Sequence, residues 1–233
     1  MRRLSQFLLI AVFTFLLPGS LHANVNGTPL KHYPKHSLLY ENLNVEHLDL
    51  LGEIILLPEE SFDYIEVAKI ISRIDALPEK MLRRITEERI YLALFNGKLT
   101  DNPSARDLRG VIPRGYKTDK TWDEVPGVGG SKLVLAKIGS SEQGAGHSSV
   151  NLELHELAHS IDRHVYKLIR EDPKFLEIWK KETKYLFPGR DYFLNYPEEY
   201  FAETFAMYYL GGEHKELLRK VAPETYWFID SLE

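Results

Sequence analysis

The sequence predicts an α+β fold, in which a small mixed α/β part is followed by a helical part. Short β-type runs alternate with helical patterns up to residue 138, whereas helical periodicity dominates from about Val150 onward. The chain has 233 residues, and 44% of them are hydrophobic, which is enough to bury the core of one domain. We therefore expect one domain over residues 51–233, with an N-terminal subdomain over 51–147 and a helical subdomain over 148–233.

The first 23 residues have the pattern of a signal peptide. Arg2 and Arg3 precede an apolar run from Phe7 to Leu17, which is too short to span a bilayer. Ala23 then offers a small residue for cleavage. An uncleaved N-terminal anchor is the alternative. The pattern predicts a secreted, extracellular protein that has no membrane association after cleavage.

Charge and cysteine content exclude several classes of function. The formal net charge is -5 and there is no basic run, so neither nucleic acid nor an anionic membrane surface is an expected partner. The chain has no Cys, which excludes a disulfide framework and thiolate metal ligands. We expect a monomer that relies on its core for stability.

The N-terminal half has two helical patterns between two strand-like runs. The residues before them, 24–50, are polar and show little periodicity, so we interpret them as a loose N-terminal arm. The expected elements are a strand over Glu53–Leu57 at the edge of the sheet, a helix from Ser61 through Ala76, a short helix opened by Pro78, and a strand over Ile90–Phe95 ended by the turn Asn96-Gly97.

Residues 96–131 are rich in Pro and Gly, and a loop of this length in a small domain usually has a function. A strand over Leu133–Ile138 and a flexible connection over Gly139–Gly146 follow. The remaining chain is expected to form helices over about 150–169, 173–186, 197–210 and 222–232.

The motif His155-Glu156-Leu157-Ala158-His159 carries the chemistry. On a helix, positions i and i+4 lie on one face, so the two imidazoles point toward one place, as a zinc ion requires. Glu156 then lies beside the metal, where it can take a proton from zinc-bound water and later donate it to the leaving amine. The alternative is an amphipathic helix with two incidental histidines.

A catalytic zinc site needs a third protein ligand and an open position for water. The extended pattern with a Gly and a third His is absent, because Asp162 and Val165 stand at those positions. Glu199 and Glu203 lie four residues apart on an otherwise aromatic and apolar helix. We expect Glu199 to ligate zinc and Glu203 to orient a ligand from behind, the alternative being that both face solvent.

Tyr192 lies seven residues before Glu199, on the expected loop before that helix. Its phenol could donate a hydrogen bond to the oxyanion of a tetrahedral intermediate. The chain contains 13 Tyr, most of which are expected to be packing residues, so spacing alone leaves this role open.

Several motifs together resemble the Pro-Pro endopeptidases, a family of secreted bacterial zinc peptidases related to the catalytic domain of anthrax lethal factor. The resemblance covers the chain from about Leu51 to the C-terminus. It implies a single zincin-like metallopeptidase domain with one Zn²⁺ per chain. The motifs that carry it are Gly97–Asp101, Gly110–Gly115, Lys120–Gly127, Asn151–Asp162, Tyr196–Ala206 and Ala222–Tyr226.

The resemblance implies roles at matching positions. His155, His159 and Glu199 match the zinc ligands of the family, and Glu156 matches its general base. Tyr192 matches the tyrosine that stabilises the oxyanion.

Further matches concern the surroundings of the metal. Asp162 ends the motif that contains the two histidines, and we expect it to support them from behind. Glu198 matches a carboxylate of the substrate site. A Gly-rich loop that closes over bound substrate is matched by Gly127–Ser131, and its expected substrate-binding residues are Gly129, Gly130 and Ser131.

This sequence departs from the family pattern in one place. It has Pro113-Arg114-Gly115-Tyr116 where the best-known member has Pro-Lys-Gly-Trp, which puts the preference for residues flanking the cleaved bond in doubt. Arg114 remains an expected substrate-binding residue. Tyr116 and Trp122 would supply aromatic surfaces for proline rings, and Leu133–Ile138 would be the edge strand along which the substrate lies; a core role for Trp122 is the alternative.

The leading hypothesis is hydrolysis of the bond between two prolines in proline-rich segments of extracellular or cell-surface proteins. Proline lacks an N–H and has a restricted φ, so such a bond is a poor substrate for a cleft that pairs with an extended strand. One alternative is a zinc peptidase of other specificity, similar to lethal factor. Another is a secreted binding module whose zinc is structural or catalytically silent.

Overall fold

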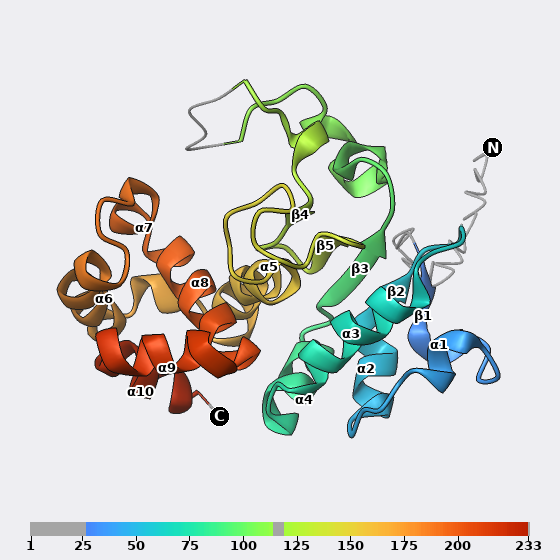
Figure 1. Cartoon of the computed structure of the whole chain (residues 1–233), viewed down its shortest axis with the longest axis horizontal. Coiled ribbons are helices and arrows are strands. Elements are labelled where there is room, and N and C mark those ends of the chain that lie inside the picture. Colours follow the sequence, from blue (N-terminus) through green and yellow to red (C-terminus); the bar gives the residue numbers. More distant parts are fainter. Residues whose placement is uncertain (1–26, 114–118, 233) are drawn as a thin grey trace, which may run out of the picture.

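The computed structural model describes residues 27–113 and 119–232. The predicted signal peptide and two predicted substrate-binding residues, Arg114 and Tyr116, lie outside the described residues. Figure 1 shows a sheet with its helices on one side of helix α5 (Leu152–Ser160) and the C-terminal helices on the other. This arrangement confirms the predicted α+β class.

The residues from 27 to 50, expected to belong to a loose arm, are packed against the domain. They form strand β1 (Thr28–Pro29), helix α1 (Leu38–Glu41) and the start of helix α2 (Leu48–Ile54). The arm interpretation is therefore wrong for these residues, because a few leucines among the polar residues anchor the segment in the core. The anchoring leucines are Leu30 and Leu39, which are each at most 1% exposed.

The sheet is mixed and has the strand order β1-β2-β3-β5-β4. Strands β2, β3 and β5 are parallel, and β1 and β4 are antiparallel to their neighbours. Both segments that we expected at an edge therefore lie inside the sheet, and the outer strand beside β5 is the short β4. The bounds are β2 (Ile55–Leu57), β3 (Tyr91–Phe95), β4 (Gly127–Val128) and β5 (Leu133–Lys137).

Helices α3 (Tyr64–Asp75) and α4 (Glu79–Glu87) connect β2 to β3. Helix α3 begins after Asp63, whose carboxylate accepts the N–H groups of Ile65 and Glu66 at 3.0 Å, and not at Ser61 as predicted. Helix α4 begins after Pro78, as predicted. The apolar sides of both helices are buried in the main core, through Val67, Ile70, Ile71, Ile74, Met81, Leu82 and Ile85.

The Pro- and Gly-rich stretch forms short 3₁₀ turns that cover the other face of the sheet. Its turns are Leu99–Asp101, Pro103–Leu108 and Trp122–Glu124. They form a second, smaller core with residues of β2, β3 and β5. Both faces of the central strands are therefore buried, which explains why these strands are apolar almost throughout. The smaller core consists of Leu56, Ala93, Phe95, Leu99, Ala105 and Leu135.

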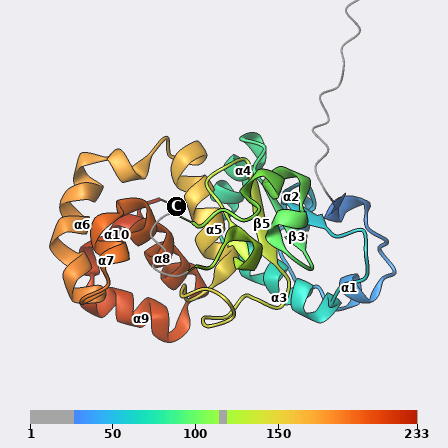
Figure 2. The same ribbon diagram turned by 90° about the horizontal axis from the view of Figure 1, so that it is seen from above.

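Three C-terminal helices have almost the bounds that the sequence predicts. They are α6 (Pro173–Leu186), α8 (Pro197–Leu210) and α10 (Pro223–Asp230). Each begins with a proline, which is favoured in the first turn because its missing N–H would have no partner there. Figure 2 shows these helices gathered on the side of α5 opposite the sheet.

Other parts of the C-terminal half differ from the prediction. Helices α7 (Asp191–Asn195) and α9 (Gly212–Val221) were not expected, and Tyr192 lies in α7, not in a loop. Helix α5 ends at Ser160 and continues as one π-helical turn over Ile161–Val165, so the predicted helix over 150–169 is too long. None of the helices in the described part of the chain has the length and apolar character needed to cross a membrane.

Candidate active site

Helix α5 carries the predicted metal motif and packs against both β5 and α8. Asn151 caps this helix, since its Oδ1 accepts the N–H of Leu154 at 2.9 Å. His155 and His159 lie one turn apart on the same face, with ring centroids 4.9 Å apart. Helix α8 places Glu199 opposite the two histidines, so the three predicted ligands come from two packed helices.

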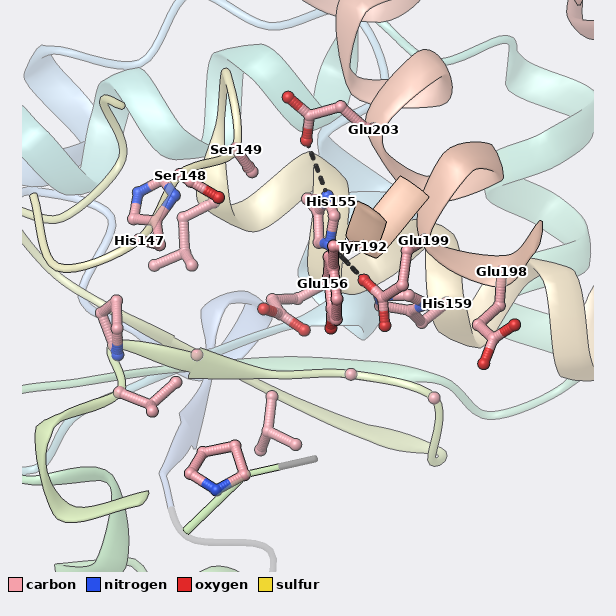
Figure 3. Close-up of a pocket in the computed structure, with 18 of the residues that line it drawn as sticks. His147, Ser148, Ser149, His155, Glu156, His159, Tyr192, Glu198, Glu199 and Glu203 are labelled. Carbon is pink, nitrogen blue, oxygen red and sulfur yellow. Dashed lines mark hydrogen bonds and ion pairs between the residues drawn. The ribbon is translucent and has the colours of Figure 1, made fainter. Parts of the chain in front are cut away.

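The three donor atoms form a nearly equilateral triangle. Nε2 of His155 and Nε2 of His159 are 3.2 Å apart, and each lies 3.4 Å from Oε2 of Glu199 (Figure 3). Zinc binds such ligands tetrahedrally at about 2.0–2.1 Å, which requires donor atoms to be about 3.3 Å apart. The three side chains therefore fit one zinc ion and leave the fourth position open.

Glu203 contacts His155 on the side away from the triangle (Figure 3). Its Oε2 lies 3.0 Å from Nδ1 of His155, and its Oε1 accepts the N–H of Val150 at 2.9 Å. A carboxylate beside Nδ1 favours the proton of His155 on that nitrogen, which would leave the lone pair of Nε2 for a metal ion. This is the contact that the sequence predicts for Glu203.

Burial and ion pairing have opposite effects on the pKa values of His155 and Glu199. Burial has the largest effect on His155 and lowers its pKa, but the hydrogen bonds with Glu199 and Glu203 together outweigh it and hold that pKa well above 6.5. Burial also raises the pKa of Glu199, and here the two histidines outweigh it and lower the pKa. Glu199 is therefore ionised at neutral pH, as a metal ligand must be.

Glu156 lines the cleft beside the triangle (Figure 3). Burial raises the pKa of its carboxyl, and the nearby charge of Glu199 adds to that effect. The histidines and the backbone N–H of Gly129 act in the opposite direction, but burial prevails. A carboxyl with a raised pKa beside the ligands suits a group that accepts a proton and later returns it.

The segment after β4 packs directly against α5. A Cβ at Gly129 would lie 1.9 Å from the backbone oxygen of Glu156, so only glycine allows this approach. Gly130 has φ of +83° and donates its N–H to Oγ of Ser160 at 3.0 Å. That hydroxyl in turn donates to the backbone oxygen of Ser131 at 2.7 Å. The predicted Gly-rich segment is thus one wall of the site.

One cleft of about 850 Å³ contains the triangle and all five of the predicted substrate-binding residues that the structure describes. Tyr192 and Glu198 line it from the helical side, and Trp122 lines it from the opposite side. Trp122 also packs against the smaller core, so its side chain has a core contact as well as a place on the cleft.

The structure does not place Asp162 against the histidines. Its Oδ1 accepts the backbone N–H of Arg170 at 3.0 Å, and its carboxylate also pairs with the guanidinium of Arg170. The expectation that Asp162 supports the zinc ligands is therefore wrong. The π-helical turn that contains Asp162 shifts the helical register after His159, and the sequence pattern shows no sign of this turn.

Sequence reasoning missed several polar side chains that line the cleft, among them His147, Arg163, Arg170 and Arg190. His147 directly follows the connection Gly139–Gly146 that we interpreted as flexible. Arg163 lies in the π-helical turn, and Arg190 immediately precedes the unpredicted helix α7. Arg163 and Arg170 follow the motif closely in the sequence, but only the fold shows that they and Arg190 line the same cleft.

Comparison with known proteins agrees with this geometry. Residues 42–232 match the family model described as "Anthrax toxin lethal factor, N- and C-terminal domain". A Pro-Pro endopeptidase from Clostridioides difficile (strain 630) is 36% identical over 231 residues, which cover 99% of both chains. A Pro-Pro endopeptidase from Paenibacillus alvei is 34% identical over 190 residues, 81% of this chain and 87% of that protein.

Comparison with solved structures indicates the same family. The solved structure of the Pro-Pro endopeptidase from Paenibacillus alvei superimposes with a TM-score of 0.75 and 34% sequence identity. The match covers 79% of this chain and all of the solved chain. The chain is therefore a peptidase and belongs to the Pro-Pro endopeptidase family.

Proposed function

We propose that this protein is a zinc-dependent endopeptidase that hydrolyses the bond between two prolines in proline-rich segments of extracellular or cell-surface proteins. The observation that carries the proposal is the triangle of His155, His159 and Glu199, with sides of 3.2–3.4 Å, in a chain whose relatives are named for Pro-Pro cleavage. The triangle accounts for the chemistry, and the relatives account for the substrate class.

A bound zinc ion supplies Lewis-acid chemistry, which polarises the scissile carbonyl and makes the attacking water more acidic. The chain's own residues perform the proton transfers. Glu156 accepts a proton from the attacking water and delivers it to the departing proline nitrogen. A proline nitrogen leaves as a secondary amine, so it needs this proton as much as any other amine does. The raised pKa of Glu156 makes its carboxylate a stronger base for the first transfer.

Tyr192 is the proposed donor to the oxyanion that forms when water adds to the carbonyl. Its ring contacts Phe193 and Tyr196, with centroids 5.9 and 5.5 Å away, and these contacts hold the side chain in α7 at the cleft. A hydrogen bond from the phenol would be stronger in the transition state than to the neutral carbonyl, which is what catalysis requires.

The opposite wall favours a substrate that does not pair as a strand. Strand β4 has two residues, Gly127 and Val128, so it offers few backbone groups to an added strand. A Pro-Pro segment lacks two N–H donors, so it forgoes few backbone hydrogen bonds when it binds in such a cleft and not along a longer strand. The ring of Trp122 provides an apolar surface on this side.

The proposed location is extracellular, and the proposed active form is a monomer. Both rest on the sequence: the pattern of residues 1–23 is that of a signal peptide, and no cysteine is available for a covalent link between chains. A substrate in surface proteins follows from that location.

A peptide library with a fixed central Pro-Pro pair and varied flanking residues tests the proposal. We expect mass spectrometry to show cleavage between the two prolines by the mature protein, and a chelator to stop it. A parallel library in which alanine replaces the second proline should remain intact. Cleavage at other bonds in both libraries would contradict Pro-Pro specificity, and cleavage that survives complete zinc removal would contradict the mechanism.

A further inference from the structure

The cleft contains arginines that the proposed mechanism does not use. Arg163, Arg170 and Arg190 line its helical side, and Lys120 also lines it. Apart from the carboxylates of the catalytic centre, Glu198 is the one acidic side chain among the described residues that line the cleft. Outside the catalytic centre, the described lining therefore has four basic side chains and one acidic side chain, whereas the chain as a whole has a formal net charge of -5.

Arg170 does not contribute free positive charge. The buried carboxylate of Asp162 pairs with its guanidinium and accepts its backbone N–H. This pair closes the turn that follows α5 and accounts for one of the three arginines. The two others need a different explanation.

Arg163 lies one helical turn beyond the ligand His159. The π-helical turn over Ile161–Val165 directs it toward the segment after β4, where Nη1 donates to the backbone oxygen of Gly130 at 3.4 Å. No carboxylate among the described residues lies within ion-pair distance of this guanidinium. Arginine has five N–H donors, so most of them remain available to a ligand in the cleft.

Arg190 is held by an aromatic ring, not by a carboxylate. Its guanidinium carbon lies 5.0 Å from the centre of the Phe193 ring, which stacks on Phe187 with centroids 4.2 Å apart. This contact orients the planar group and leaves its N–H edge free. Within the described part of the chain, Arg190 also has no carboxylate partner.

We propose that Arg163 and Arg190 bind a carboxylate of the substrate, so that the peptidase selects an acidic residue on one side of the cleaved bond. The planar N–H fork of arginine matches a carboxylate in geometry as well as in charge. The inference rests on the proposed function and specifies its substrate further. The carboxylate can come from an Asp or Glu side chain or from a free C-terminus, and the two sources are separated below.

Matched peptides with a central Pro-Pro pair test this inference. Each flanking position carries Glu, Gln or Lys in turn, with both peptide ends blocked, and a further set has a free C-terminus. We expect Glu at one or more positions on a single side to raise kcat/KM over Gln by about fivefold for each arginine engaged, and Lys to lower it. The preference should shrink as ionic strength rises, because salt screens exposed charges.

Variants assign the preference to the two arginines. Arg163→Gln and Arg190→Gln should each reduce the Glu-to-Gln ratio of kcat/KM, and the double variant should bring it to about one. Arg163→Lys and Arg190→Lys keep the charge and should retain much of the ratio. Arg219→Gln on α9 removes an exposed arginine that pairs with Glu216 away from the cleft, and it should leave the ratio unchanged.

The outcomes separate this inference from the proposed function. If Glu and Gln peptides are cleaved equally between the prolines, the carboxylate site is refuted while Pro-Pro cleavage stands. An unchanged ratio in the double Gln variant would also refute it. If only a free C-terminus confers the preference, the source is the terminal carboxylate and not a side chain, which overturns the selection of an acidic residue. If no Pro-Pro peptide is cleaved, the proposed function fails and the inference fails with it.

Discussion

The wall of the cleft that carries the predicted metal ligands consists of two helices packed face to face, whereas the opposite wall consists of a two-residue strand and a Gly-rich segment. On the first wall, Glu199 and Glu203 are 8% and 1% exposed and are each bonded to histidine. On the second wall, Gly129 and Gly130 are held by close backbone approach to α5 and by one serine hydroxyl.

This difference predicts that the helical wall determines the reaction and that the glycine-rich wall determines which substrates fit. The helical wall holds its donor atoms through several buried contacts that constrain one another, as a metal site requires. The glycine-rich wall can lie close to α5 because its glycines have no side chains. Small substitutions there should therefore change which substrates fit the cleft and leave the reacting groups in place. Changes on the two walls should therefore have separable effects on zinc binding, kcat and KM.

The largest expected effect is on the helical wall, at Glu156. Glu156→Gln keeps the shape of the side chain and removes its ability to transfer a proton. We expect kcat for a Pro-Pro peptide to fall by about a hundredfold to ten-thousandfold while one zinc remains bound per chain. Steady-state kinetics and metal analysis of the same preparation measure both. Near-normal kcat in the zinc-loaded variant would show that another group is the base.

The next effect concerns the contact behind His155. Glu203→Gln weakens the acceptor for Nδ1 of His155, and we expect zinc affinity to fall by about 10- to 100-fold. A competition titration with a fluorescent chelator measures it. Glu182→Gln is the matched control, since Glu182 is also a buried carboxylate but bonds the N–H groups of Glu224 and Thr225 at the start of α10.

The control is expected to lower Tm without changing zinc affinity, because Glu182 lies outside the cleft. Equal loss of zinc affinity in the two variants would mean that general destabilisation, and not the contact with His155, sets the affinity.

On the glycine-rich wall, Gly129→Ala should displace the segment from α5. The new Cβ would lie 1.9 Å from the backbone oxygen of Glu156, so something must shift, at a cost of about 1–3 kcal/mol in unfolding free energy. We expect KM to rise more than kcat falls, with zinc retained. Gly139→Ala is the comparison, because Gly139 does not line the cleft, its Cβ would meet no atom within 4 Å, and the variant would report only the cost of its φ of +79°.

The smallest expected effect is at Trp122. Trp122→Ala removes an aromatic surface from the cleft, and we expect KM for a Pro-Pro peptide to rise by about two- to tenfold. Trp227→Ala serves as the control, since Trp227 is 62% exposed on α10 and does not line the cleft. An unchanged KM in a folded Trp122→Ala protein would assign this tryptophan to the smaller core alone.

The sequence predicted the helical wall better than the other wall. The spacing of His155 and His159 is local to one helix, and Glu199 follows Pro197, which marks a helix start. Such signals depend only on neighbours in the chain. The same reasoning missed α7, which has five residues, and α9, which begins at a glycine.

The opposite wall depends on contacts between distant segments. Strand β4 has two residues and shows no alternating pattern, and the position of β5 inside the sheet follows from the strand order. The pairing of Asp162 with Arg170 depends on a π-helical turn that sequence periodicity does not reveal. Family resemblance marked the residues of this wall, but only the fold shows which of them meet.

Zinc titration of the metal-free protein tests the central claim most directly. Zinc is added in steps to chelator-treated mature protein, and cleavage of a peptide with one Pro-Pro bond is followed at each step. The geometry of His155, His159 and Glu199 predicts that cleavage between the two prolines rises linearly and reaches its plateau at one zinc per chain. Full cleavage without zinc, or one tightly bound zinc with no cleavage between prolines, would contradict the account.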